Sequence, residues 1–457
     1  MTAGPLARPA GSAGSERPHA ARSLDAALDA ELDARLEAVD VLLEQGYPGD
    51  DGSRQPVHTV YVPGDRYDRD LPARWGEQAR AALRAAGGSR HLVRALGVDP
   101  ALGVAPLVDA KLAAEPIEDL RIDFEDGYGD HGDAAEDAAA HAAAHELVAA
   151  LAAGSSPAFV GIRIKSFERA TRRRGVRTFD VFTTALVAGL RASGTDASGV
   201  GGDLPAGYVV TLAKVSAVEQ VEAMVAVCER LEAALDLPAG RLRFEIQVET
   251  PQAVLGPDGT ATVARMVHAA GARAVGLHYG TYDYSASLGI AAEYQSMEHP
   301  AADHAKAVMQ LAAAGTGVRV SDGSTNVLPV GDTRTVGAAW VLHGRLVRRS
   351  LERGFYQGWD LHPAQLASRY AATYAFFRRA APAAVKRLRD YVRVVDGLGE
   401  PGGVLDEPAT AKALAWFLLR ALDCGALTPT EVAGDDETLT RRRLEALRDA
   451  RPGVDAH

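Results

Sequence analysis

The stretch Arg243-Phe-Glu-Ile-Gln-Val-Glu-Thr-Pro-Gln-Ala253 runs from an apolar strand into a turn, and the carboxylate of Glu249 stands where the strand ends. A second stretch, Gly276-Leu-His-Tyr-Gly-Thr-Tyr-Asp-Tyr284, repeats the arrangement with Asp283. Parallel barrels carry metal ligands and catalytic groups at the carboxyl ends of their strands. The two carboxylates therefore either share a hard divalent cation, first of all Mg²⁺, or cap the helix or turn that follows.

Strand-like and helix-like segments alternate on both sides of these two stretches. Helical runs separate most of the strands, which predicts an α/β fold, a (β/α)₈ TIM barrel. No Gly-x-Gly-x-x-Gly turn follows the first strand, which disfavours a dinucleotide-binding sheet. The expected strands cover residues 57–63, 119–127, 158–165, 207–215, 242–248, 272–278, 317–321 and 354–363.

The ends of the chain differ in character from this alternating part. Residues 1–22 are rich in small residues and arginine and predict a disordered tail, and residues 23–56 predict an amphipathic helix and a linker. The barrel is expected over 57–365, and 366–457 predict a C-terminal helical extension packed on the barrel or on a neighbouring subunit. A Gly/Ser-rich insertion at 193–207 predicts a flexible loop.

Composition narrows the functional classes. The chain has 457 residues, a formal charge of −11 and a pI near 5.7, which argues against general nucleic-acid binding. No apolar run is long enough for a membrane span, and no secretory signal is recognisable. Cys228 and Cys424 sit in helical patterns without zinc spacing. We therefore expect buried thiols in a cytoplasmic protein.

Further charged residues stand at predicted strand ends. Asp123-Phe-Glu-Asp126 crowds carboxylates at the barrel mouth, either as a solvated acidic turn or as part of a site. Arg163 lies inside the third strand, where burial requires a partner. It either clamps an anionic substrate or forms a salt bridge to the acidic cluster, and both roles are compatible.

Two later positions give weaker signals. Lys214 ends the fourth strand. Asp322 belongs to an Asp-Gly pair after the seventh strand, which is typical of a turn. It is nonetheless expected to face the same mouth, where an unliganded carboxylate works as acid or base.

These motifs, in this order, resemble the citrate lyase β-subunit / HpcH–HpaI aldolase superfamily. The resemblance covers roughly residues 57–365. The segment Gly276-Leu-x-x-Gly-x-x-Asp-Tyr284 also resembles malate synthases. The motifs that carry the first likeness are Val62-Pro63-Gly64, Asp123-Phe-Glu-Asp126, Gly161-Ile-Arg163, Ala213-Lys214-Val215, Glu249-Thr250, Gly280-Thr-Tyr-Asp283 and Leu361-His362-Pro363-Ala-Gln365.

The resemblance implies a Mg²⁺-dependent carbon–carbon lyase or aldolase, with Mn²⁺ as the alternative cation. Glu249 and Asp283 would bind the metal, and Arg163 would hold the reacting oxygens and stabilise an enolate. Glu125, Asp126 and Asp322 would serve the catalytic steps. Substrate contacts would come from Arg163, Lys214, Thr250, Gly280 and Thr281. The substrate would be a small 2-oxo or hydroxy carboxylic acid. Because barrels of this family usually assemble as trimers or multiples of trimers, the resemblance also implies a homo-oligomer.

The chain also departs from the family pattern. Lys165 replaces an asparagine, Ala213 replaces a proline, and Gln357-Gly358 stands where Gly-Lys is usual. These changes leave open whether the substrate is a free acid or a coenzyme A thioester. Two alternatives remain: an acyl-CoA condensing transferase of the malate synthase type, and a non-catalytic barrel that serves as a binding module.

Overall fold

Residues 26–194, 204–398, 407–434 and 438–449 are described by the structure, a computed structural model. The chain divides into two compact units, the first ending at Pro48 and the second beginning at Gly49. The described part of the first unit is the helix α1 (Ala26–Gly46), which confirms the expected N-terminal helix. The predicted tail at 1–22 lies outside the described residues. In the described segments no helix is both long and apolar enough to cross a bilayer.

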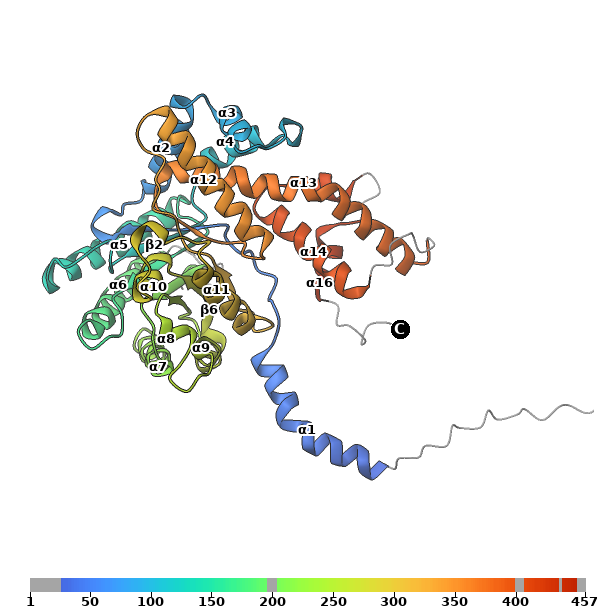
Figure 1. The fold of residues 1–457 in the computed structure, drawn as a ribbon. Coiled ribbons are helices and arrows are strands. Elements are labelled where there is room, and N and C mark those ends of the chain that lie inside the picture. The colour runs from blue at the N-terminus through green and yellow to red at the C-terminus, as the bar shows by residue number, and fades with distance from the viewer. Residues whose placement is uncertain (1–25, 195–203, 399–406, 435–437, 450–457) are drawn as a thin grey trace, which may run out of the picture. The chain divides into compact units, whose positions relative to one another are not determined.

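Eight parallel strands form the centre of the second unit (Figure 1). The sheet order is β7-β6-β5-β4-β3-β2-β1-β8, so each strand lies beside its neighbour in sequence and β8 lies beside β1. The strands are β1 (Thr59–Pro63), β2 (Asp119–Asp123), β3 (Phe159–Ile164), β4 (Tyr208–Leu212), β5 (Phe244–Val248), β6 (Ala274–Tyr279), β7 (Arg319–Ser321) and β8 (Trp359–Asp360).

The ring of strands closes between β7 and β8. Ser321 pairs in parallel with Gln357, and the Asp322 amide donates to the Gln357 carbonyl at 2.9 Å. The Trp359 amide donates to the Gly323 carbonyl at 3.2 Å. The predicted (β/α)₈ barrel is therefore confirmed. Strand β8 is shorter than the predicted 354–363, because the chain is still closing the preceding helix where Phe355 N bonds to Ser350 O.

Helices separate consecutive strands, as the sequence pattern predicted, and surround the barrel (Figure 1). Three further helices, α2 to α4, connect β1 to β2, and α6 connects β3 to β4; none of these four was assigned from the sequence. The helices between strands are α2 (Leu71–Ala85), α3 (Ser89–Ala95), α4 (Val104–Ala114), α5 (Asp133–Ala152), α6 (Arg172–Ser193), α7 (Val218–Ala234), α8 (Pro251–Val254), α9 (Thr262–Ala270), α10 (Thr281–Ser287), α11 (Pro300–Ala313) and α12 (Thr333–Glu352).

The C-terminal extension packs on the barrel within the same unit. The long helix α13 (Pro363–Val395) donates from Tyr370 Oη to the Pro116 carbonyl at 3.0 Å and from Tyr374 Oη to the Cys424 carbonyl at 3.0 Å. Helices α14 (Pro408–Asp423), α15 (Pro429–Ala433) and α16 (Arg441–Asp449) follow. Cys228 and Cys424 are free and buried, as expected. Most of the predicted flexible loop at 193–207 lies outside the described residues.

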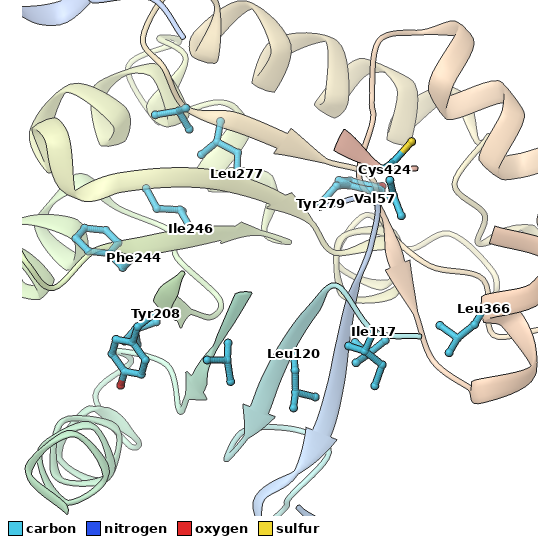
Figure 2. Packing of buried hydrophobic residues seen from close by; sticks show 14 of the residues in the cluster. Val57, Ile117, Leu120, Tyr208, Phe244, Ile246, Leu277, Tyr279, Leu366 and Cys424 are labelled. Atoms are coloured by element: carbon cyan, nitrogen blue, oxygen red, sulfur yellow. The ribbon is translucent and has the colours of Figure 1, made fainter. Parts of the chain in front are cut away.

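Alternation along each strand separates two environments. One set of residues faces the helices and is apolar; Figure 2 shows Leu120, Ile246 and Leu277 in this layer. Full burial of such a side chain contributes about 1.5–3 kcal/mol, so this layer stabilises the barrel. The other set fills the barrel interior and is unusually polar, with Asp119, Arg121, Arg163, Glu245 and Gln247 all buried. Buried charges require partners, and those partners define two sites, one at each end of the barrel.

Candidate active site

A bidentate ion pair between Arg163 and Asp123 lies at the carboxyl ends of β2 and β3. Arg163 Nε and Nη2 each donate to one oxygen of Asp123 at 2.7 Å. The same carboxylate accepts from the backbone amides of Glu125 (3.0 Å) and Gly127 (2.9 Å). A Cβ at Gly127 would lie 2.5 Å from Asp123 Oδ2, so a side chain there would clash. The predicted salt bridge from Arg163 to the acidic cluster is confirmed, and it fixes the guanidinium in one orientation.

Two aromatic rings fix the guanidinium further. The Tyr61 and Trp359 rings lie 4.6 and 5.4 Å from the Arg163 guanidinium carbon, which is cation–π range. The remaining nitrogen, Nη1, lies 3.4 Å from Gln247 Oε1 and 3.5 Å from Glu125 Oε2. Tyr61, Gln247 and Trp359 are not among the residues that the sequence motifs predicted for the site. Strand alternation, which puts Gln247 on the same face as Glu249, was the available signal for Gln247.

Lys214 brings three of the predicted acidic residues together. Its ammonium Nζ lies 2.5 Å from Glu125, 2.7 Å from Asp126 and 3.4 Å from Asp283. Its backbone is in the left-handed region, with φ 52°, which is strained for a lysine. The ammonium thus holds a set of carboxylates that would otherwise repel one another.

Glu249 is buried beside this cluster, against the backbone of Lys214. Its Oε1 accepts from the Lys214 backbone amide at 2.8 Å. A Cβ at Gly280 would lie 2.4 Å from the Glu249 side chain, so the close approach of β6 requires glycine there. Burial raises the pKa of Glu249 to about 8, against the lowering effect of Lys214 and Arg163 and with the repulsion of Asp283 and Glu125. The nearby positive charges therefore do not compensate for the burial of this carboxylate.

The two threonines predicted to contact substrate make hydrogen bonds that hold local structure, and their contact with substrate stays a prediction. Thr250 caps α8 by accepting from the Ala253 amide at 3.3 Å, and it donates to the Val215 carbonyl at 2.9 Å. The helix-capping role considered for Glu249 thus belongs to the next residue. Thr281 is buried, and its hydroxyl accepts from the Ser324 amide at 3.2 Å.

Asp322 does not join the cluster. Lys306 Nζ donates to both of its oxygens at 2.9 and 3.0 Å, and Ser350 Oγ donates to one of them at 2.6 Å. The side chain is 1% exposed. The carboxylate expected to be unliganded is thus held by Lys306 and Ser350, and its role as an acid or base stays a prediction. The Asp322 carboxylate is paired with a lysine of α11, a partner that lies in another element and cannot be seen in the Asp-Gly motif.

A cavity of about 520 Å³ adjoins the cluster and includes Glu125, Asp126, Lys165, Arg174 and Lys214 in its walls. Its size suits a small ligand. Lys165, which stands in place of the family's asparagine, donates to Glu136 Oε2 at 2.6 Å and to the Phe124 carbonyl at 2.9 Å. It therefore secures the loop after β2.

The arrangement of charges fits a divalent cation. Glu249 follows β5, whereas Asp283 lies in the first turn of α10, just after β6, and both approach Lys214. Glu125, Asp126 and Asp283 lie around the Lys214 ammonium, Glu249 accepts from the Lys214 backbone amide, and Arg163 is paired most closely with Asp123. Across the described segments, no three acidic, histidine or cysteine side chains converge closely enough to hold a metal by themselves. Mg²⁺ usually takes only one or two protein carboxylates and keeps water as its other ligands, so two are sufficient.

These features define a class: a (β/α)₈ barrel with an arginine–carboxylate cluster at the carboxyl ends of its strands, the end at which such barrels carry active sites. The family model described as "Domain of unknown function (DUF6986)" matches residues 36–452, so the chain belongs to that family. No curated protein matches the chain.

Several solved structures are similar to the chain. Protein CitE from Mycobacterium tuberculosis, in complex with magnesium, acetoacetate and coenzyme A, is 16% identical, with 82% of this chain and 99% of that chain covered and a TM-score of 0.44. The citrate lyase β-subunit from M. tuberculosis, with oxaloacetate and magnesium, is 17% identical (70% and 98% covered, TM-score 0.40). The Haloferax volcanii malate synthase magnesium/glyoxylate complex is 14% identical (87% and 98% covered, TM-score 0.44).

The same two enzyme types, citrate lyase β-subunit and malate synthase, were the ones that the sequence motifs resembled. The likeness at these identities and TM-scores is too low to transfer chemistry from those proteins to this chain. What the site does must therefore be argued from its own residues.

Proposed function

We propose that this protein is a divalent-cation-dependent carbon–carbon lyase or aldolase that acts on a small 2-oxo or hydroxy acid, free or as a coenzyme A thioester. One observation carries the proposal. A permanently charged guanidinium, fixed by Asp123 and two rings, lies at the barrel mouth beside carboxylates that exceed the local positive charge. Cleavage next to a carbonyl needs a fixed positive charge for the developing oxyanion and a place for a cation.

Glu249 and Asp283 would hold the cation, with Glu125 and Asp126 beside them. When bound, a divalent cation polarises a carbonyl oxygen and lowers the cost of negative charge on it. Mg²⁺ suits the oxygen-only donor set, and Mn²⁺ accepts the same ligands.

Arg163 would stabilise the enolate oxygen. Asp123 engages Nε and Nη2, which leaves Nη1 for a substrate oxygen, because its present contacts are long at 3.4 and 3.5 Å. The rings of Tyr61 and Trp359 keep the guanidinium from swinging away. A donor that needs no rearrangement during the reaction contributes most to the rate.

Glu125 would move the proton. Burial raises its pKa, against the lowering effect of Arg163 and Lys214, which brings the carboxyl closer to the range useful for acid–base work. It lies in the wall of the 520 Å³ cavity. Lys214 would bind the substrate carboxylate, while Thr250, Gly280 and Thr281 would position the loops that carry the cation ligands.

The test is proton exchange and cleavage with purified protein. Deuterium exchange into the methyl group of pyruvate and cleavage of a panel of malyl- and citramalyl-type substrates are measured with Mg²⁺, with Mn²⁺ and with EDTA. We expect cation-dependent activity that falls more than about 100-fold in Glu249→Gln and in Arg163→Met. Asp258→Asn, an exposed carboxylate on the loop before α9, is the matched control.

Full activity of folded Glu249→Gln, or activity unaffected by EDTA, would contradict the proposal. Release of free coenzyme A from acetyl-CoA and glyoxylate would instead assign the site to acyl-transferring condensation. The Asp283-Tyr284 pair, which suggested that alternative, does not favour it here. Tyr284 is buried, and its ring packs against Tyr279 at a centroid distance of 5.6 Å.

A further inference from the structure

A second cavity, of about 350 Å³, opens at the opposite end of the barrel, where the strands begin. Its walls include Arg121, Arg243, Glu245, His278 and Arg319. None of these residues belongs to the candidate active site. The volume lies in the range of small-molecule pockets, although barrels of this kind carry their active sites at the other end.

The floor of this cavity is a satisfied charge network. Glu245 accepts from Arg121 Nε at 3.0 Å and from Arg121 Nη2 at 2.9 Å, and His278 Nε2 lies 2.9 Å from the same carboxylate. Asp119 also pairs with Arg121 and accepts from Thr59 Oγ1 at 2.8 Å. Because donors engage these carboxylates, the floor does not present free negative charge to a ligand.

The mouth of the cavity has the opposite character. Arg319 donates through Nη2 to the Ser53 carbonyl at 2.8 Å and to the Ser53 hydroxyl. Its nearest carboxylate, Asp51, is 3.6 Å away and 67% exposed. Burial lowers the pKa of Arg319, and the positive charges of Arg420 and Arg243 add to this effect against Asp51 and Asp50. Within the described part of the chain, the guanidinium therefore has no buried carboxylate at ion-pair distance.

Arg243 is similarly short of partners. Among the described residues, the one hydrogen bond of its guanidinium runs from Nη2 to the Ala206 carbonyl at a long 3.4 Å. Two guanidinium groups thus line one mouth, each with unused donors, opposite one exposed carboxylate. Planar guanidinium donors match carboxylate and phosphate oxygens well.

We propose that this cavity binds a small organic anion, a carboxylate or a phosphate, between Arg243 and Arg319. The site is separate from the proposed function and holds whether or not the other end of the barrel is a lyase. The ligand enters where the strands begin, with its anionic group at the two arginines and the rest of the molecule toward His278.

Anion binding at this position is expected to stabilise contacts between distant parts of the second unit. The Gly49 amide donates to the Gly315 carbonyl at 2.8 Å, and Arg448 of α16 donates to the Gly52 carbonyl at 3.4 Å. The segment 49–53 therefore connects the start of β7 to the C-terminal helices. An anion that holds Arg319 in place reinforces this connection and stabilises the folded chain by mass action.

The test compares the melting temperature and the calorimetric binding of phosphate and of succinate against chloride at matched ionic strength. Ala206 is exposed beside Arg243, so Ala206→Glu adds a competing carboxylate without removing a buried contact. We expect at least tenfold weaker anion binding in Ala206→Glu and binding within twofold of wild type in the neutral match Ala206→Gln. Arg319→Met is expected to lose binding, and Ala206→Glu serves as the readout if that variant does not fold.

A second experiment finds where the anion binds, because Arg163 and Lys214 at the other end of the barrel also attract negative charge. Selenate is soaked into crystals and found by its anomalous signal, and phosphate binding is repeated with Lys214→Met. The proposal expects a peak between Arg243 and Arg319 and undiminished binding in Lys214→Met. Equal binding by wild type and Ala206→Glu, or a peak only at the opposite end, overturns it.

Discussion

The two ends of the barrel each hold a buried arginine, but the charges around the two arginines differ. Near the start of the strands, Arg121 binds Asp119 and Glu245, whose oxygens are otherwise filled by hydroxyl and imidazole groups. Near their ends, Arg163 binds Asp123 closely and Glu125 at 3.5 Å, and the carboxylates of Glu125, Asp126 and Asp283 lie around Lys214. In the first arrangement every carboxylate has a close donor, whereas in the second the carboxylates outnumber the cationic groups.

The pKa directions express this difference. Burial disfavours the charged form of Glu245, but Arg121 and His278 outweigh it and hold the pKa of Glu245 well below its usual range. Burial raises the pKa of Glu249 to about 8, because Lys214 and Arg163 do not offset it. A matched network stabilises the fold, and an unmatched one is suited to take up a cation.

Removal of Arg121 should have the largest effect on stability. Arg121→Met leaves two buried carboxylates without their main partner and should lower the free energy of unfolding by about 3–5 kcal/mol. Urea denaturation at pH 7 measures this. Arg177→Met, which removes an exposed partner of Asp137, should leave the midpoint unchanged within error. A loss as small as that of the control would mean that the interior network contributes little.

The Asp322→Asn variant tests whether a carboxylate that is fully ion-paired differs in its role from Glu249, which lies at the same end of the barrel. The variant removes the close ion pair of the buried Lys306 ammonium and leaves only Asp303 at 4.0 Å, and we expect a loss of about 3 kcal/mol in unfolding free energy. Turnover of the folded variant should stay within a few-fold of wild type, in contrast to Glu249→Gln. A hundredfold fall in kcat with normal stability would return Asp322 to the acid–base role that the sequence suggested.

Glu249 should make stability depend on pH. Its pKa is raised in the folded state, so between about pH 4.5 and 8 the native protein holds a proton that the unfolded chain has lost, and stability falls as pH rises through this window. Metal-free Glu249→Gln should therefore be more stable than wild type at pH 9, on the order of 2 kcal/mol, and equal to it near pH 4. Chemical denaturation in EDTA at both pH values gives the difference. Equal stability at pH 9 would show that burial is compensated.

The smallest expected effect concerns Lys214. Its ammonium occupies the space among Glu125, Asp126 and Asp283, so it competes with a cation for the same carboxylates. Lys214→Met should bind Mn²⁺ about tenfold more tightly, roughly 1.4 kcal/mol, as followed by electron paramagnetic resonance. Lys214→Arg keeps the charge and should show no gain. Weaker binding by Lys214→Met would mean that the lysine organises the carboxylates and does not compete.

The order of the barrel could be read from the chain because each strand carries a local signal. Every observed strand overlaps its predicted range, since the strands are short apolar runs bounded by turn residues. Strand β8 has only two residues, fewer than predicted, because its pairing depends on β1 and on the end of α12. Helices α2 to α4 and α6 were not assigned, although α2 and α6 are amphipathic, with apolar faces that pack against α13 and α5.

The candidate site was predictable in its positions and less so in its partners. Placement at strand ends selected Glu125, Asp126, Glu249 and Asp283, and Lys214 more weakly, while Arg163 was selected because a charged residue inside a strand needs a partner. The same rule also selected Asp322, because position along a strand does not say which way a carboxylate turns. Tyr61 and Trp359 were missed because they reach Arg163 across the barrel interior.

The sequence by itself determined the alternation of strands and helices, the polar residues at strand ends, and therefore the barrel and the end at which to look. Those properties depend on neighbours within a few residues. Only the tertiary structure decided which charges are matched: Arg163 with Asp123 forty positions away, Arg121 with Glu245, and Lys306 with Asp322. Charge balance depends on distance in space, so the surplus around Glu249, and the opposite surplus between Arg243 and Arg319, become visible only once the ring of strands is closed.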